Sequence, residues 1–316
     1  MNTRYRTVTA LAVMVAVGIG TAGCGRYSLS ALKAQKAYKD ANESYKGSEW
    51  KEAAEKYEYV LRQDPSRTEV YFFLANSYDN AYKPSRAGEP ENDALMQKAI
   101  ENYTKAAQVD ANPEMKKLAM QYLVAAYGPD KLNDPTKAEP IVLEMVKLAP
   151  NEPGNYFALA KIYEDAGRYE EAEQALMKAR DAAPNDASVY VQMSGFYNRQ
   201  GDFEKTMEAL HKAADIKPDD PQGHQLVATY YWEKAQKDHR LTPAQKKDYI
   251  AKGIAAADRA LKLNPEYIEA LTYKNILLRM QGNLETDMAK RTELYKQADE
   301  LRNKAMELSK RKTAGT

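Results

Sequence analysis

Residues 155–184, NYFALAKIYEDAGRYEEAEQALMKARDAAP, contain two runs of apolar residues separated by a glycine. The first run extends from Tyr156 to Tyr163 and the second from Tyr169 to Ala179, both at the spacing of one helix face. Gly167 lies between them, where glycine can supply the left-handed conformation that ends a helix. Pro184 follows the second run and prevents it from continuing. The stretch therefore predicts two helices joined by a tight turn.

This pattern recurs along the chain. Similar sequence segments end at six prolines: Pro65, Pro113, Pro150, Pro184, Pro218 and Pro265. The three central intervals are close to 34 residues, and the wider ones indicate insertions, the largest of them after Tyr78 and Tyr231. A repeat of this length is typical of helical solenoids. The 316 residues leave room for about seven helix pairs.

The segments resemble the tetratricopeptide repeat. In residues 190–218, Tyr190, Met193, Ser194 and Tyr197 precede Gly201, and Phe203, Leu210 and Ala213 precede Pro218, at the same offsets as in residues 156–184. The resemblance covers residues 32–312. It implies an all-α fold, a right-handed superhelix of about seven helix pairs with a C-terminal capping helix. In that helix an apolar stripe runs from Leu294 to Leu308, and a coiled-coil docking site is the alternative to capping.

The resemblance also implies a binding groove. In this family, ligand contacts come mainly from the first helix of each pair, whereas tyrosines such as Tyr78, Tyr163, Tyr197 and Tyr231 pack between helices. Carried over residue by residue, the predicted groove consists of Phe72, Asn76, Asp79, Asn80, Phe157, Lys161, Glu164, Val191, Asn198, Arg199, Gln222, Gln225, Thr229 and Trp232. This mixture of aromatic rings, amides and scattered charges suits a protein or peptide ligand.

The N-terminus has the order of a secretory signal. Arg4 and Arg6 precede an apolar run over residues 8–19, followed by small residues and the single cysteine, Cys24. Residues 21–24, TAGC, resemble the lipobox of bacterial lipoproteins. The resemblance implies cleavage after residue 23, a lipid anchor on Cys24 and, because Gly25 rather than Asp follows, retention at the outer membrane. The alternative is a secreted protein whose one thiol is incidental.

Composition and motifs exclude several functions. Lys and Arg number 46 against 45 Asp and Glu, so the near-neutral chain lacks the cationic excess that nucleic acid binding needs. The three histidines are too far apart along the chain to form a zinc motif, and no phosphate-binding glycine loop or catalytic serine motif is present. We therefore expect neither an enzyme nor a cofactor or metal site.

These observations predict a signal peptide over residues 1–23, a short tether over 24–31, a solenoid over 32–312 and a disordered tail over 313–316. The expected function is that of a scaffold, lipid-anchored in the cell envelope at the periplasmic face of the outer membrane, that binds protein partners in outer-membrane or surface-structure assembly. The alternative is a lipoprotein that binds polysaccharide or peptidoglycan through its aromatic side chains.

Overall fold

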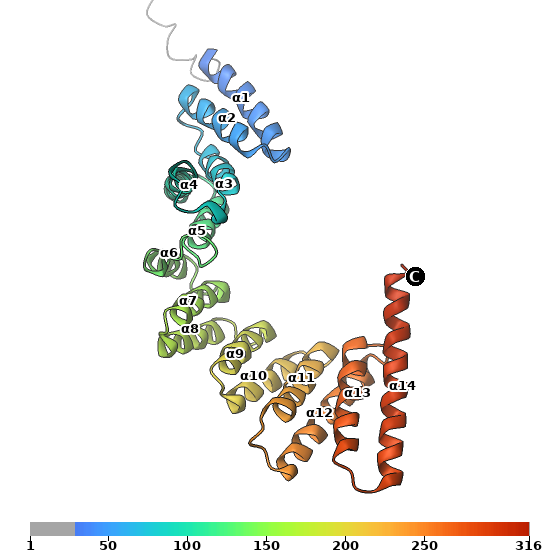
Figure 1. Ribbon diagram of the computed structural model, residues 1–316. Helices are drawn as coiled ribbons and strands as arrows, with labels where there is room; N and C mark the ends of the chain where they lie inside the picture. Colours follow the sequence, from blue (N-terminus) through green and yellow to red (C-terminus); the bar gives the residue numbers. More distant parts are fainter. Residues whose placement is uncertain (1–28, 316) are drawn as a thin grey trace, which may run out of the picture. The chain divides into compact units, whose positions relative to one another are not determined.

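The computed structural model describes residues 29–315 and is helical throughout this range (Figure 1). It contains fourteen α-helices and one short 3-10 helix, with no strand among the described residues. The predicted all-α solenoid of helix pairs is confirmed. The chain divides into two compact units, one ending at Leu148 and the other beginning at Ala149.

The first unit contains three helix pairs in which each helix packs on the next along the chain. Its elements are α1 (Leu29–Lys46), α2 (Trp50–Gln63), α3 (Val70–Ala81), η2 (Pro84–Arg86), α4 (Pro90–Val109), α5 (Pro113–Ala126) and α6 (Pro135–Leu148). Small residues such as Ala53 and Ala99 are fully buried where helices cross, and Tyr57 and Tyr103 fill the space beside them. Alanine at a crossing lets two helix axes approach closely, which explains the small residues in the repeat.

The second unit contains four helix pairs. Its elements are α7 (Pro153–Asp165), α8 (Tyr169–Ala182), α9 (Ala187–Arg199), α10 (Phe203–Ile216), α11 (Pro221–Lys237), α12 (Pro243–Leu263), α13 (Ile268–Asn283) and α14 (Met288–Thr313). The predicted turn glycines adopt the left-handed conformation, with φ of 73° at Gly167 and 77° at Gly201. Aspartate side chains cap the next first helices: Asp186 accepts from the Ser188 N–H and Asp220 from the Gln222 N–H, each at 2.9 Å.

The two large insertions lengthen helices rather than forming long loops. In the first unit, α4 has 20 residues, and its partner α3 is followed by a short turn containing η2. In the second unit, α11 and α12 have 17 and 21 residues, and the Thr242 side chain caps the start of α12, where Pro243 is the first residue. The extensions of α11 and α12 contribute Ala235 and Ile250 to a cluster with Leu277 of α13. The insertion after Tyr231 therefore adds core as well as surface.

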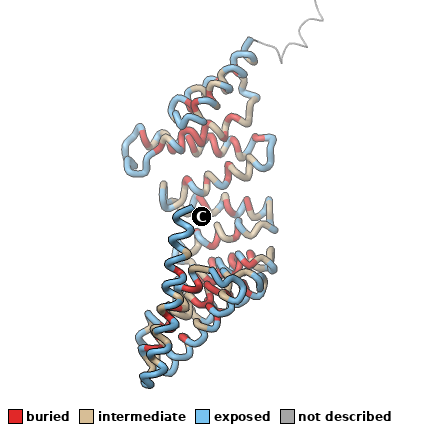
Figure 2. The backbone as a smooth tube through the Cα atoms, turned by 90° about the vertical axis from the view of Figure 1, so that its right-hand side faces the viewer, coloured by how far each residue is buried: buried red, intermediate tan, exposed pale blue. Residues whose placement is uncertain are grey.

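The last helix, α14, packs against α13. Ala298 is fully buried in this contact and Ala305 is 7% exposed, whereas Met306 is 52% exposed. Figure 2 shows that most of α14 is exposed, with a few buried positions along it. The residues of the apolar stripe thus cover α13, as a capping helix does. None of the helices in residues 29–315 combines the length and the apolar character needed to cross a bilayer. The predicted signal peptide and Cys24 lie outside the described residues.

Candidate partner-binding surface

In the first unit, the prediction that α3 lines a groove needs correction. Phe72 and Asn76 are each 4% exposed and Asp79 is 7% exposed, so these side chains face the interior. The ring of Phe72 lies 5.7 Å from that of Tyr103 and 5.4 Å from that of Tyr122. Helices on both sides of α3 therefore cover the face on which a ligand was expected.

The polar atoms of this buried face are already hydrogen-bonded within the unit. The Tyr45 O–H donates to Asn76 Oδ1 at 2.6 Å, and Asn76 Nδ2 donates to the Tyr103 hydroxyl at 3.0 Å. The Tyr103 O–H in turn donates to Asp79 Oδ2 at 3.3 Å, and Asp79 also pairs with Lys131. Burial raises the pKa of Tyr103, with the nearby Asp79 carboxylate as the second cause. Asn76 and Asp79 hold helices together.

Asn80 is the exception among the predicted residues of α3. It is exposed, and its Nδ2 donates to the Asn76 carbonyl oxygen at 2.8 Å and to Asn76 Oδ1 at 2.9 Å. Its amide is therefore held at the edge of the buried network. Asn80 also lines a hollow of about 390 Å³ together with Trp50 of α2 and Lys83, and no other predicted residue of α3 does so.

In the second unit, five of the ten predicted residues are exposed, and a sixth, Glu164, is ion-paired to one of them. They come from the first helices α7, α9 and α11, and we call them the α7–α9–α11 surface: Lys161, Glu164, Val191, Asn198, Arg199 and Gln222. Val191 is 38% exposed, although it is aliphatic. An exposed aliphatic residue on the same helix as an exposed amide is typical of a surface that another protein covers.

An ion pair joins the first two helices of this surface. Arg199 of α9 donates from Nε to Glu164 Oε1 at 2.7 Å and from Nη2 to Glu164 Oε2 at 2.9 Å. The Glu164 side chain is only 12% exposed, whereas Arg199 is 57% exposed. The hydrogen bond from Glu164 raises the pKa of Arg199. This two-point contact fixes the position of α7 relative to α9.

The remaining predicted residues are turned partly or fully inward. Gln225 is 8% exposed and donates to the Thr229 hydroxyl at 2.7 Å, so the two polar groups satisfy each other. Trp232 is half-buried, and its ring lies 5.4 Å from that of Tyr273 on α13. Phe157 is also half-buried. The rings of Trp232 and Phe157 are therefore only partly accessible.

A hollow of about 460 Å³ adjoins the surface at Asn198. Tyr230 and Lys237 of α11, and Arg240 in the turn that follows this helix, line its other side. Arg240 donates from Nε to Asp238 at 2.9 Å, and this contact, followed by that of Lys234, holds the pKa of the Asp238 carboxyl far below its usual range. The hollow exists because the insertion after Tyr231 lengthens α11. The insertion was the signal in the sequence, but the only one of its residues that the sequence analysis assigned to the site was Trp232, which does not line this hollow.

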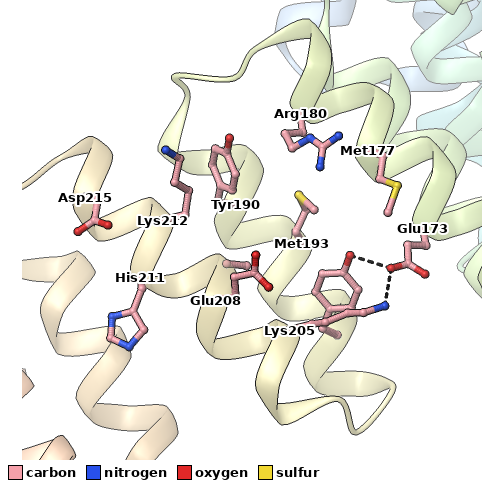
Figure 3. Close-up of a pocket in the computed structure, with 12 residues that line it drawn as sticks. Glu173, Met177, Arg180, Tyr190, Met193, Lys205, Glu208, His211, Lys212 and Asp215 are labelled. Atoms are coloured by element: carbon pink, nitrogen blue, oxygen red, sulfur yellow. Dashed lines mark hydrogen bonds and ion pairs between the residues drawn. The ribbon is translucent and has the colours of Figure 1, made fainter.

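A second hollow of about 600 Å³ lies among α8, α9 and α10 (Figure 3). Tyr190 and Met193 of α9 line it together with Met177 of α8, and Arg180 and Lys212 lie at the Tyr190 end (Figure 3). We call it the α8–α9–α10 hollow. The sequence analysis missed it because residues from the second helices of two pairs form much of its lining, whereas the family pattern directs attention to the first helices.

At the other end of this hollow a hydrogen-bonded triad joins two helix pairs (Figure 3). The Tyr197 O–H donates to Glu173 Oε1 at 2.9 Å, and Lys205 Nζ donates to the same oxygen at 2.8 Å. The Lys205 contact lowers the pKa of Glu173, whereas burial raises the pKa of Tyr197. This tyrosine, predicted to pack between helices, is 6% exposed. Its hydroxyl links α9, the first helix of one pair, to α8, the second helix of the pair before it.

Among residues 29–315, no group of three or more His, Cys, Asp or Glu side chains is arranged to hold a metal ion. The chemistry of the described surface is therefore that of amides, aliphatic groups and paired ions.

Comparison with known families agrees with this helix arrangement. Two tetratricopeptide repeat models match, one over residues 131–194 and the other over residues 187–220. Residues 131–220 are therefore similar to tetratricopeptide repeats. These matches cover α7 to α10, and the Glu164–Arg199 pair and the Glu173–Tyr197–Lys205 triad connect neighbouring repeats. No curated protein sequence matches the chain.

Solved structures of repeat proteins share the fold. The C-terminal part of a TPR repeat-containing protein from Cytophaga hutchinsonii matches with a TM-score of 0.56 and 16% identity, covering 86% of this chain and 98% of that one. A tetratricopeptide repeat protein from Parabacteroides merdae gives a TM-score of 0.47 and 12% identity, with 84% and 99% coverage. YrrB, described as a TPR protein with an unusual peptide-binding site, gives 0.40 and 22%, with 59% and 87% coverage. At these identities the likeness concerns the fold alone.

Proposed function

We propose that this protein is a non-catalytic scaffold, anchored by lipid in a bacterial cell envelope, which binds protein partners through its α7–α9–α11 surface. The observation that carries the proposal is the exposure of Val191 and Asn198 on α9 and of Gln222 on α11, with Asn198 also lining a hollow of about 460 Å³. Exposed amides can hydrogen-bond a polypeptide backbone, and an apolar side chain of the partner fits a hollow of this kind.

The charges of the surface favour recognition by shape and hydrogen bonding. Glu164 and Arg199 neutralise each other, Lys161 pairs with Asp165, and Lys237 pairs with Glu233 at the hollow. Paired ions leave little net field to attract a charged ligand. The expected partner is a polypeptide segment with amide and apolar side chains, and its binding should depend weakly on salt.

A pull-down experiment tests the surface. The chain from residue 24 onward, with Cys24→Ala, is used to recover partners from an envelope extract. The double variant Asn198→Lys with Gln222→Lys places two long cations on the surface and should abolish recovery. Gln174 is an exposed glutamine on α8, outside the surface, and Gln174→Lys is the matched control that should leave recovery intact. Partners retained equally by both variants would refute the assignment.

The lipid anchor is tested separately in cells. The proposal places the mature protein at the periplasmic face of the outer membrane, in outer-membrane or surface-structure assembly, and is supported by the charged, apolar and small-residue order that precedes Cys24. Palmitate label should be incorporated into the parent chain and be absent from Cys24→Ala. Label that persists in the variant would remove the anchor from the proposal.

The described structure gives less support to polysaccharide or peptidoglycan as the ligand. Tyr78 and Tyr197 are 5% and 6% exposed, and Trp232 packs on Tyr273, so these rings lack the free faces that stack on sugars. A glycan array run with the same chain gives the direct comparison. Glycan binding that survives in the Asn198→Lys and Gln222→Lys variant would favour this alternative.

A further inference from the structure

The outward side of α1 carries two leucines followed by three lysines. Leu29 is 69% exposed and Leu32 is 58% exposed, and Lys33, Lys36 and Lys39 are exposed as well. Positions 29, 32, 33 and 36 share one helix face, and position 39 continues it. We call these five residues the α1 outer face.

The α1 outer face has no internal partner that explains it. The opposite side of α1 carries the fully buried Ala34 and Ala41, which face α2. The first helix of a repeat array ordinarily presents a polar outer side to solvent, and the two exposed leucines depart from that rule. A further function for this side of α1 is therefore indicated.

The charged residues of the α1 outer face are all lysines, and the acidic residues Asp40 and Glu43 follow it on the same side of the helix. Residues 29–39 include three lysines and no acidic residue. None of the three lysines forms an ion pair with another described residue. Their cationic ends are consequently available to an external anionic surface, while their aliphatic stems extend the apolar area begun by the leucines.

We propose that the α1 outer face lies on an anionic lipid bilayer. Leucine side chains entering the headgroup boundary beside lysines that meet lipid phosphates are the chemistry of an interfacial helix. The nearness of a bilayer rests on the proposed lipid anchor, since five residue steps from Cys24 to Leu29 span at most about 17 Å. The anchor and the face then act as two membrane signals on one short segment.

The weak attraction of the α1 outer face to lipid becomes effective because the lipid anchor holds the helix beside the bilayer. Each lysine close to an anionic surface strengthens membrane partitioning about fivefold, so the three lysines together contribute roughly 100-fold. The anchor confines the helix to the bilayer surface, where this attraction suffices to orient the first turns of α1. The rest of the protein then extends from a defined point on the membrane.

Vesicle flotation tests the proposal without the anchor. The chain from residue 24 onward, which includes every described residue, is prepared with Cys24→Ala. It is mixed with vesicles of phosphatidylcholine containing about 30% phosphatidylglycerol, or with phosphatidylcholine alone, at moderate ionic strength. Binding to the anionic vesicles and little binding to the neutral ones is the expected result.

Two variants with equal charge change identify the face. Replacing Lys33, Lys36 and Lys39 by Gln should weaken partitioning roughly 100-fold. The control replaces three exposed lysines of the second unit by Gln, namely Lys178, Lys212 and Lys217, and should leave partitioning within about fivefold of the parent. The double variant Leu29→Gln with Leu32→Gln should also weaken it, and circular dichroism should show parental helix content throughout.

Absence of binding to anionic vesicles by the parent, or equal losses in the two lysine variants, would overturn the proposal. Neither outcome bears on the palmitate labelling of Cys24, and loss of that labelling would leave the vesicle result standing. The two proposals can therefore fail independently.

Discussion

The hydroxyl of Tyr197 should stabilise the second unit by linking two helix pairs. Tyr197 is 6% exposed and donates to Glu173 at 2.9 Å, and the Glu173 side chain is 26% exposed. A hydrogen bond to a charged group contributes about 1.5–3 kcal/mol. Lys205 donates to the same carboxylate at 2.8 Å, and this contact does not depend on the Tyr197 hydroxyl. We therefore expect a loss of about 1–2 kcal/mol in the free energy of unfolding.

The assay uses the distribution of the two tryptophans. Trp50 lies on α2 in the first unit and Trp232 on α11 in the second. In a Trp50→Phe background the fluorescence of Trp232 reports urea unfolding of the second unit. Tyr169, which is 49% exposed on α8, supplies the control, and Tyr169→Phe should change stability by less than about 0.5 kcal/mol.

A double-mutant cycle isolates the interaction. Tyr197→Phe and Glu173→Gln are measured singly and together in the same background, and their coupling should be about 1 kcal/mol. The reasoning would be refuted by a coupling indistinguishable from zero together with a Tyr197→Phe effect no larger than that of Tyr169→Phe.

Three further predictions concern packing and pH. Alanine at Gly253 would place its Cβ 2.9 Å from the side chain of the fully buried Leu277. At Gly195 the added Cβ would meet only the end of the Arg199 side chain. Gly253→Ala should therefore be about 1–3 kcal/mol less stable than Gly195→Ala, as measured by urea unfolding. Ala172 is fully buried at a helix crossing, and Ala172→Leu should lower the thermal midpoint by overpacking, whereas an unchanged midpoint would contradict the close approach of α7 and α8. Burial, and then the Glu58 carboxylate, raise the pKa of Tyr78 to about 12. The folded state thus favours the neutral phenol, and this contribution to the free energy of unfolding is complete below pH 10 and is lost between pH 10 and about 12. In Tyr78→Phe, the decrease in stability over this pH range, followed by Trp50 fluorescence, should be shallower.

Local chemistry made the helix pairs predictable from the sequence. Gly167 and Gly201 adopt the left-handed conformation, and the apolar spacing around them places Leu176 and Leu210 in the interior. These features depend on neighbours within one repeat. Each further repeat of about 34 residues forms the same local contacts again.

The predicted groove on α3 is buried by residues that are distant along the chain. Asn76 meets Tyr45 and Asp79 meets Lys131, partners that are 31 and 52 positions away along the chain. No local pattern indicates that these side chains converge on α3 and bury it. The insertion after Tyr231 was likewise visible as extra length, but its folding into the ends of α11 and α12 depends on Ile250 packing against Leu277.

Site-specific photocrosslinking in living cells tests the central claim most directly. A photoreactive phenylalanine analogue is introduced at Asn198 on the α7–α9–α11 surface, at Met177 in the α8–α9–α10 hollow, or at Gln174 outside both. Our account predicts a discrete protein adduct from Asn198 and none from Gln174. An adduct from Met177 alone, or none from Asn198 while the protein is folded and abundant, would contradict it.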